Sequence, residues 1–393
     1  MRKFFSVLII LLTLFGNSYA LDLKHSWEWE VIVIPPDSGW DVEPGHSISN
    51  ALAWCEREIA SSSSGAGGHD VKFNRLLLPD DKNLNRLEIP INNRVIAVMS
   101  FSNSEGDKIL INKLSKVNVP LFLAGGENVL IDPKGKPLFN IFALDLFRDY
   151  RCEAFAEYAK KLFDKNDIRI AIAASRFTVN QEREAKIFYD MIDKRGFVPM
   201  PFWADASVRD TFTMMAEEIE SQENNPGVMV SFLGSMGSRE VWRNFMRLRT
   251  SWRLWNCAAP ENAYLSCRGM LLADQNIKLN ELGGFEELKR KIWNTRAIAI
   301  MDNVAAGRAI ALVEWLQKGI NSLPQPVNEM PRNNLLRNLE RVKGITFGNQ
   351  TLDINPTLHR PAKRNAYIVE VRDKKYRHMD TIKVSGLRYA DVY

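Results

Sequence analysis

RVIAVMS, at Arg94 to Ser100, is a nearly unbroken apolar run, and a polar segment and a helical pattern follow it as far as Lys116. A short apolar run of this kind is typical of a strand that is buried on both faces of a parallel sheet. Similar runs recur along the chain, and most of them precede an amphipathic segment with a period near 3.6 residues. This alternation predicts an α/β protein with doubly wound parallel sheets.

The predicted strands fall into two groups, which indicate two lobes. The first group has strands at Glu30–Pro35, Lys72–Leu78, Arg94–Ser100 and Val119–Ala124, with helices at Ile48–Ala60 and up to Lys116. The second group has strands at Ile168–Ala174, Val198–Trp203, Gly227–Leu233 and Arg253–Ala258, with helices at Arg151–Phe163, Gln181–Lys194, Val208–Ser221 and Arg239–Leu248. Helices at Asp302–Lys318 and Asn333–Arg341 and strand-like pieces at Ile345–Phe347 and Ala366–Arg372 follow.

The composition is that of a globular protein. Of the 393 residues, 46% are hydrophobic and 25% are charged. The 52 Lys and Arg residues against 47 Asp and Glu residues give a formal net charge of +5. Nucleic-acid-binding proteins concentrate their basic residues on one face or along one helix, so this small excess predicts no nucleic-acid partner.

The first twenty residues have the three parts of a secretory signal peptide. Arg2 and Lys3 form a basic start, an apolar run extends from Phe4 to Phe15, and the small-x-small ending is Ser18-Tyr19-Ala20. Cleavage after Ala20 would remove two positive charges, leaving +3, and would place the mature chain in the periplasm. The alternative is an uncleaved anchor, although the apolar run is shorter than the ~20 residues that span a bilayer. No later segment is long and apolar enough to cross a membrane, so we expect a soluble exported protein.

Four cysteines, Cys55, Cys152, Cys257 and Cys267, permit three complete pairings in an oxidising compartment. Cys257 and Cys267 close the shortest loop and are the first choice for a disulfide. No CxxC pair occurs, and the five histidines are scattered without ligand spacing. No structural zinc site or other metal site is therefore expected.

The sequence lacks the motifs of several enzyme classes. Gly135-Lys136 is followed by Pro137 and has no upstream glycine, so a phosphate-binding P-loop is excluded, and no G-x-G-x-x-G follows a strand. Gly234-Ser235-Met236-Gly237 resembles a nucleophile elbow only superficially, because G-x-S-x-G is not met. No nucleophile with a paired base is present, so we expect neither an enzyme nor a cofactor.

The ordered segments resemble the periplasmic substrate-binding proteins of the branched-chain amino acid type, the two-lobed receptors that feed ABC importers. The likeness covers nearly the whole mature chain, and it depends on the order and spacing of several pieces. These are GGHDVKFNRLLLPDD at Gly67–Asp81, RVIAVMSFSNSEGD at Arg94–Asp107, NVPLFLAGG at Asn118–Gly126, LFNIFALD at Leu138–Asp145, IAIMDNVAAGRAIAL at Ile298–Leu312, and GITFGNQTLDINPTLHRPAKRNAYIVEV at Gly344–Val371.

The resemblance implies a domain organisation and a partner. In that family the chain crosses three times between lobes, which implies a first lobe of residues 21–147 plus 267–355 and a second of residues 148–266 plus 356–393. It also implies a small polar ligand, an amino acid or a related amide or organic acid, bound in a cleft that closes by hinge motion. An ABC permease in the membrane would recognise the closed form, and we expect the binding protein to be a monomer.

Ser102, Asn103 and Ser104 are the first candidate ligand-binding residues. They follow one predicted strand and precede a helix, so hydroxyls and free backbone N–H groups would converge at the positive end of a helix dipole. That arrangement suits a carboxylate or another acceptor group. Simple N-capping by Ser104 is the alternative, and the two interpretations are compatible.

Ala124, Gly125 and Gly126 end the next strand, where the resembled family offers backbone groups and a Ser or Thr hydroxyl to an amino acid. Glycines replace the hydroxyl residue here, which argues against an ordinary α-amino acid ligand. In Ala259-Pro260-Glu261, the carboxylate of Glu261 resembles the family's partner for a ligand amine, and a desolvated carboxylate needs such a partner. A surface glutamate is the alternative.

The predicted apolar wall of the site comes from other loops. Phe177 and Val179 follow one strand of the second group, and Leu233 and Gly234 follow another, with ordinary packing as the alternative for each. Trp40 lies in the loop after the first strand and would cover the cleft with an aromatic ring.

These observations predict an extracytoplasmic solute-binding protein for an ABC importer. The alternative function is a periplasmic ligand-sensing component that works with a membrane receptor or an alcohol-oxidation system, which the missing hydroxyl at Gly125-Gly126 favours.

Overall fold

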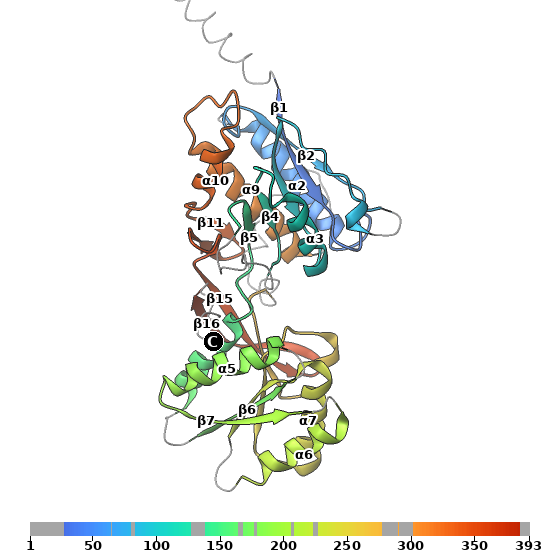
Figure 1. Ribbon diagram of the computed structural model, residues 1–393, viewed down its shortest axis with the longest axis vertical. Helices are drawn as coiled ribbons and strands as arrows, with labels where there is room; N and C mark the ends of the chain where they lie inside the picture. Colours follow the sequence, from blue (N-terminus) through green and yellow to red (C-terminus); the bar gives the residue numbers. More distant parts are fainter. Residues whose placement is uncertain are drawn as a thin grey trace, which may run out of the picture. The chain divides into compact units, whose positions relative to one another are not determined.

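The computed structural model describes residues 27–63, 65–79, 83–126, 138–163, 168–176, 179–205, 208–222, 227–276, 290 and 302–385. The chain forms two compact units (Figure 1). Unit 1 comprises residues 1–144 and 284–359, and unit 2 comprises residues 145–283 and 360–393. The chain therefore passes between the two units three times.

The sheet of unit 1 has five parallel strands in the order β2-β1-β3-β4-β5. The strands are β1 (Glu28–Ile34), β2 (Asp70–Arg75), β3 (Val95–Ser100), β4 (Leu121–Leu123) and β5 (Ile141–Ala143). Every residue of the central strands β3 and β4 is buried, as expected for a sheet that helices cover on both faces, and so is every residue of the edge strand β5. The strand order reverses between β1 and β3, and this reversal makes a topological switch point where ligands of open α/β sheets bind.

Segments from distant parts of the sequence complete unit 1. Its helices are α2 (Gly45–Ser61), η2 (Leu84–Arg86), α3 (Ser104–Leu114), α9 (Asn303–Asn321) and α10 (Arg332–Leu339). Helix α9 packs against α2, and Figure 1 shows the orange helix beside the blue one. The buried ring of Trp315 on α9 has its centroid 5.4 Å from that of Phe122 and 5.6 Å from that of Phe142. Short strands β11 (Ile345–Phe347), β12 (Gln350–Leu352) and β13 (Ile354–Asn355) follow α10.

The sheet of unit 2 has seven strands in the order β16-β15-β10-β9-β8-β6-β7. The strands are β6 (Arg169–Ser175), β7 (Val198–Ala204), β8 (Val228–Phe232), β9 (Arg253–Asn256), β10 (Leu271–Asp274), β15 (Lys363–Arg372) and β16 (Lys375–Ser385), and the short β14 (Arg360–Pro361) precedes β15. The five strands from β10 to β7 are parallel, whereas β15 and β16 are antiparallel to their neighbours. The parallel part repeats the order of unit 1, so its switch point lies between β6 and β8.

The helices of unit 2 enclose a separate core. They are α4 (Tyr150–Leu162), α5 (Val179–Asp193), α6 (Arg209–Glu220), α7 (Gly234–Leu248) and η3 (Asn262–Tyr264). The fully buried ring of Trp255 on β9 stacks on Phe155 of α4, with 5.2 Å between the ring centroids. Because each unit has its own sheet and its own core, the prediction of two doubly wound lobes is confirmed.

Two sequence-based boundaries differ from the structure. Residues 267–276 belong to unit 2 rather than to the first lobe, because β10 pairs with β9 and β15. An apolar run as short as β10 has no periodicity that assigns it to a sheet. Helix α7 begins at Gly234 rather than near Arg239, because Gly234 adopts the positive φ of 70° that turns the chain directly from β8 into the helix.

The predicted disulfide between Cys257 and Cys267 is wrong for this structure. All four cysteines lie among the described residues, and all four are buried free thiols. The sulfur of Cys257 lies 3.8 Å from that of Cys152, because α4 places Cys152 against the end of β9. Proximity along the sequence did not predict the partner of Cys257, because the neighbouring sulfur belongs to Cys152 on α4.

The predicted signal peptide, residues 1–20, lies outside the described residues. Within the part of the chain that the structure describes, no helix is both long enough and apolar enough to cross a bilayer.

Candidate functional site

The loop between β3 and α3 lies at the switch point of unit 1. The side chain of Asn103 accepts hydrogen bonds from the backbone N–H groups of Glu105 and Gly106, both at 2.9 Å. Asn103 is therefore the N-cap of α3, and the alternative that assigned this role to Ser104 is wrong. The side chain of Ser104 lies outside the described residues.

The carboxylate of Asp37 accepts hydrogen bonds from the groups that were predicted to bind a ligand. The Ser102 hydroxyl donates to Asp37 at 3.0 Å, and the backbone N–H of Asn103 lies 3.4 Å from the same oxygen. The side-chain amide of Asn103 donates to the second carboxylate oxygen of Asp37. Asp37 is exposed in the loop after β1, so the anion at the positive end of α3 is a group of the protein itself.

Asp37 is not among the residues that the sequence pattern predicts for the site. A signal was present, because Asp37 follows β1, β1 neighbours β3, and the carboxyl ends of parallel neighbours meet at one edge of the sheet.

A pocket of about 240 Å³ opens beside these three residues. Leu78, Leu84 and Ile109 give it an apolar wall, whereas Asp37, Ser102 and Asn103 give it a polar end. Gly106 is required at the start of α3, because a Cβ atom there would lie 1.9 Å from the Ser102 hydroxyl oxygen. This glycine lets Ser102 approach the helix closely enough to reach Asp37.

Trp40 lies in the same loop as Asp37 and is held within unit 1. Its indole N–H donates to the carbonyl oxygen of Leu76 at 2.7 Å, and its ring is half-buried. Gly45, the first residue of α2, has no room for a side chain, because a Cβ atom would lie 1.9 Å from the Gly39 carbonyl oxygen. The loop that carries Asp37 and Trp40 is therefore packed tightly against the start of α2.

Ala124, Gly125 and Gly126 follow β4 at the same edge of the sheet. The backbone N–H of Ala124 donates to the Ser100 carbonyl oxygen at 2.9 Å, which continues the pairing of β3 with β4. Gly126 has a φ of 100°, a conformation that a residue with a side chain rarely adopts. Backbone geometry therefore explains the glycine at position 126.

At the switch point of unit 2, β8 leads into α7 through Leu233 and Gly234. Leu233 is buried, which agrees with the alternative of ordinary packing. A Cβ atom on Gly234 would lie 3.0 Å from the side-chain nitrogen of Gln181 on α5. Gln181 is thus a polar group at this switch point that the sequence analysis did not select. Phe177 and the side chain of Val179, both predicted site residues, lie outside the described residues.

A second polar group at this edge follows β6. The guanidinium of Arg176 lies 5.4 Å from the ring centroid of Trp203 on β7 and 3.0 Å from the carboxylate of Asp205. Its side chain is half-exposed, so it remains available to a ligand.

Glu261 lies before η3 and is exposed. Its backbone carbonyl accepts a hydrogen bond from the Tyr376 hydroxyl at 2.5 Å, which fixes the backbone of this loop to β16. Glu261 therefore lies at the surface of unit 2.

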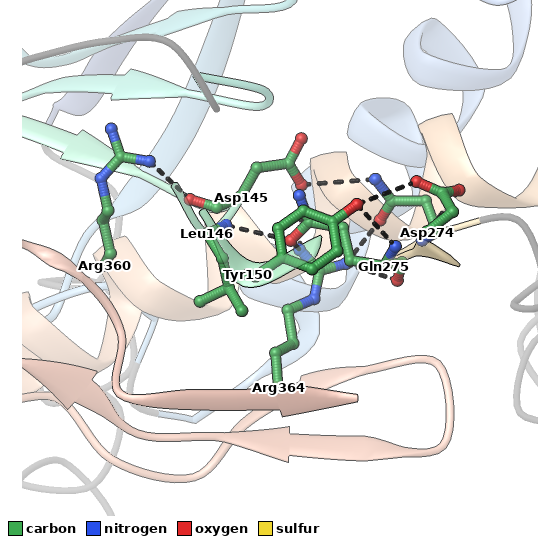
Figure 2. Close-up of polar contacts among 8 residues, drawn as sticks. Asp145, Leu146, Tyr150, Asp274, Gln275, Arg360 and Arg364 are labelled. Carbon is green, nitrogen blue, oxygen red and sulfur yellow. Dashed lines mark hydrogen bonds and ion pairs between the residues drawn. The ribbon is translucent and has the colours of Figure 1, made fainter. Parts of the chain in front are cut away.

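A buried polar network in unit 2 joins the chain segments next to all three passages between the units (Figure 2). Arg364 is fully buried and donates to the carboxylate of Asp145 at 2.9 Å and to the side-chain oxygen of Gln275 at 3.0 Å. The same Gln275 oxygen accepts from the Leu146 backbone N–H at 3.0 Å. Asp145 begins unit 2, Gln275 precedes the second passage, and Arg364 follows the third, so one cluster fixes all three segments.

We call this cluster around Asp145, Gln275 and Arg364 the crossover network, and further residues complete it. Arg360 donates to the Asp145 carbonyl oxygen at 2.7 Å, and its guanidinium lies 3.8 Å from the ring centroid of Phe147. The Tyr150 hydroxyl accepts from the Gln275 backbone N–H at 3.2 Å and donates to Asp274 at 3.3 Å (Figure 2). Buried polar groups must be paired in this way, because an unpaired one costs several kcal/mol.

A buried acid lies at the start of α5, near the crossover network. Glu184 forms an ion pair with Arg148, with a hydrogen bond of 2.9 Å, and its side chain is 3% exposed. Burial raises the pKa of Glu184 from 4.5 to about 7, although the charges of Arg148 and Arg151 oppose the rise. The folded protein therefore binds this proton more tightly than the unfolded chain does.

We expect this acid to make the stability of unit 2 depend on pH. The stabilisation from a raised carboxyl pKa is complete below pH 4.5 and is lost as the pH rises to about 7. The shift corresponds to about 3 kcal/mol over that interval. Urea denaturation of the wild type and of Glu184→Gln at several pH values measures it, and the variant should gain stability relative to the wild type as the pH rises from 4.5 to 7. A constant difference between the two proteins over this range would contradict the assignment.

No cluster of three His, Cys, Asp or Glu side chains among the described residues is arranged to hold a metal ion. No protein-family model matches the sequence, and no curated protein sequence matches it.

The fold does match solved structures. An ABC transporter substrate-binding protein from Desulfitobacterium hafniense, in complex with Leu, superposes with a TM-score of 0.62 at 11% identity, over 90% of this chain and 100% of that chain. A solute-binding protein from R. palustris, in complex with benzoate, superposes with a TM-score of 0.58 at 12% identity, over 93% of this chain and 99% of the other. A periplasmic binding protein type 1 from Bordetella pertussis gives a TM-score of 0.58 at 15% identity, over 90% and 100%.

The chain has the type I periplasmic-binding-protein fold. The match extends over both units and covers each of these solved chains almost completely. Identities this low show a common fold, and the ligand of one protein cannot be inferred from that of another. The fold therefore locates the two switch points, whereas the residues described above determine their chemistry.

Proposed function

We propose that this protein is an extracytoplasmic solute-binding protein that captures a small polar ligand for an ABC importer. The observation that carries the proposal is the similarity of the whole fold to solute-binding proteins. Both units repeat one strand order, and each has a switch point with polar side chains. A ligand that contacts both units favours a closed form, because only a difference in affinity between two states shifts their populations. An ABC permease recognises that closed form.

The ligand presents an N–H donor or an ammonium group to Asp37. The related structures hold leucine and benzoate, both of which carry a carboxylate. In this protein the donors of Ser102 and Asn103 already hold the carboxylate of Asp37, so a second carboxylate there would meet a like charge. Amides, amines and other compounds with an N–H group are therefore the preferred ligand class, and an amino acid would have to present its ammonium group rather than its carboxylate to Asp37. The apolar part of the ligand would lie against Leu84 and Ile109.

A thermal-shift screen tests this function. Amino acids, amides, amines, short-chain acids and aromatic acids are added in turn, and a ligand at 100 times its Kd should stabilise the protein by ~2.7 kcal/mol. We expect the positive compounds to carry an N–H donor. If only acids that lack nitrogen stabilise the protein, the assignment of Asp37 is wrong. If no compound of any class binds, the solute-binding function itself is in error.

The closure is measured by small-angle scattering with the best compound from the screen. A smaller radius of gyration on saturation is expected, because the two units would approach each other around the ligand. An unchanged radius at saturation would contradict closure by hinge motion. Ligand uptake by vesicles that contain the permease is measured with and without the ligand-loaded protein. Uptake that depends on the protein indicates delivery to an importer rather than ligand sensing.

Asp37→Asn is expected to weaken binding of an ammonium-bearing ligand by about 10–100-fold, because a hydrogen bond to a charged group contributes about 1.5–3 kcal/mol. Isothermal titration calorimetry measures the change. Asp41→Asn is the matched control, because Asp41 is an exposed residue of the same loop and loses the same charge. Equal affinities of the two variants would show that Asp37 does not contact the ligand.

A further inference from the structure

The cysteines are divided unequally between the two units. Unit 1 contains Cys55 alone, so it has no second thiol of its own. Cys152, Cys257 and Cys267 belong to unit 2, which leaves three possible pairs within that unit.

The geometry of unit 2 distinguishes among these pairs. The sulfur atoms of Cys152 and Cys257 lie 3.8 Å apart, and both residues belong to the same buried core. Closing this separation to a disulfide length of about 2.05 Å needs a movement of less than about 2 Å. The Cys267 sulfur lies 3.9 Å from the hydroxyl oxygen of Ser266.

We propose that Cys152 and Cys257 form the disulfide of the exported protein, whereas Cys55 and Cys267 remain thiols. The bond would join the first turn of α4 to the end of β9. Cys152 lies two residues after Tyr150, which belongs to the crossover network, so the bond would also fasten that network to the sheet. The proposal depends on the proposed function in one respect, namely export to an oxidising compartment.

The oxidant is a dithiol–disulfide oxidoreductase in the disulfide form, or oxidised glutathione in vitro. One cysteine thiolate attacks the oxidant's disulfide, which forms a mixed disulfide and releases one oxidant thiol. The second cysteine thiolate then attacks the protein sulfur of that mixed disulfide and releases the second oxidant thiol. Two protein thiols are oxidised and one oxidant disulfide is reduced, so electrons and protons balance.

Burial makes this a structural bond rather than a redox switch. Cys152 is completely buried and Cys257 nearly so. Burial raises the pKa of the Cys152 thiol, and the neighbouring Cys257 raises it further. A thiol of this kind reacts slowly once the core has formed, so the bond forms during folding and afterwards resists reductant.

Peptide mapping by mass spectrometry tests the proposal. The full chain is purified from the periplasm without reductant, free thiols are alkylated in denaturant, and the digest is analysed before and after reduction. We expect two alkylated cysteines, Cys55 and Cys267, and one linked pair of peptides that contain Cys152 and Cys257. Four alkylated cysteines, or a linkage through any other pair, would overturn the proposal.

Refolding in vitro and cysteine variants test the disulfide independently of export. Refolding of the reduced chain with oxidised glutathione should give the same linkage even when export has failed, and its absence there would count against the geometry. The double variant Cys152→Ala, Cys257→Ala should lower Tm by about 5–10 °C relative to the oxidised wild type. Cys55→Ala and Cys267→Ala should leave the linked peptides unchanged. Ligand binding is measured separately, so loss of binding with an intact bond would contradict the proposed function alone.

Discussion

Replacing Arg364 by methionine is expected to lower the free energy of unfolding by about 3–5 kcal/mol. The guanidinium is completely buried and donates to Asp145 and Gln275. Methionine fills much of the same volume but leaves the Asp145 carboxylate without its buried cation, and an uncompensated buried charge accounts for most of the cost. Urea denaturation followed by circular dichroism measures the loss.

Arg377→Met is the matched control for Arg364→Met. Arg377 also lies in unit 2 and also pairs with an aspartate, at 2.7 Å from Asp373, but its side chain is 53% exposed. An exposed ion pair contributes about 0–1 kcal/mol, so the control should lose little stability. Similar losses in the two variants would show that the crossover network does not stabilise the protein.

A conservative variant separates the charge of Arg364 from its hydrogen-bonding geometry. Arg364→Lys keeps the positive charge but has one donor group where arginine has a planar fork. We expect this variant to retain more stability than Arg364→Met, because lysine still compensates the charge of Asp145.

Trp315→Ala is expected to cost about 3–5 kcal/mol, the second large effect. The indole is completely buried, its ring contacts Phe122 and Phe142, and its N–H donates to the Leu339 carbonyl oxygen at 2.9 Å. Removal of the ring leaves a cavity between α9 and the sheet of unit 1. Chemical denaturation followed by the fluorescence of the remaining tryptophans measures the loss.

Two further variants separate the contributions of Trp315. Trp315→Phe keeps an aromatic ring but removes the shorter of two hydrogen bonds to the Leu339 carbonyl oxygen, which keeps only the Val342 backbone N–H at 3.5 Å. A smaller loss of about 1–3 kcal/mol is therefore expected. Trp242→Ala removes a half-buried indole from α7 and should cost about 1 kcal/mol or less. If Trp315→Ala were no more damaging than Trp242→Ala, α9 would not complete the core of unit 1.

The candidate site was only partly predictable. Ser102 and Asn103 were predicted from a strand end followed by a helix start, and the structure places both beside a pocket at a switch point. Asp37, their partner, lies 65 residues away from Ser102 along the chain, and nothing local connects the two. Leu233 was selected for its position after a strand, but its apolar side chain is part of the core.

The predictions of the disulfide and of the lobe boundaries were wrong for a related reason. Loop length suggested Cys257 with Cys267, yet the sulfur nearest to Cys257 belongs to Cys152, which is 105 residues away along the chain. Likewise β10 contains four residues, and only its hydrogen bonds to β9 and β15 assign it to unit 2.

The sequence by itself determined that this is an α/β protein with two parallel sheets, because the apolar period of each segment depends only on neighbouring residues and on the faces that they bury. Tertiary structure alone decided which distant side chains meet: Asp37 with Ser102, Cys152 with Cys257, and Arg364 with Asp145. Such pairs depend on the strand order and on the packing of each helix. Both are properties of the whole unit, because the position of each strand or helix depends on the apolar surface that the other elements present to it.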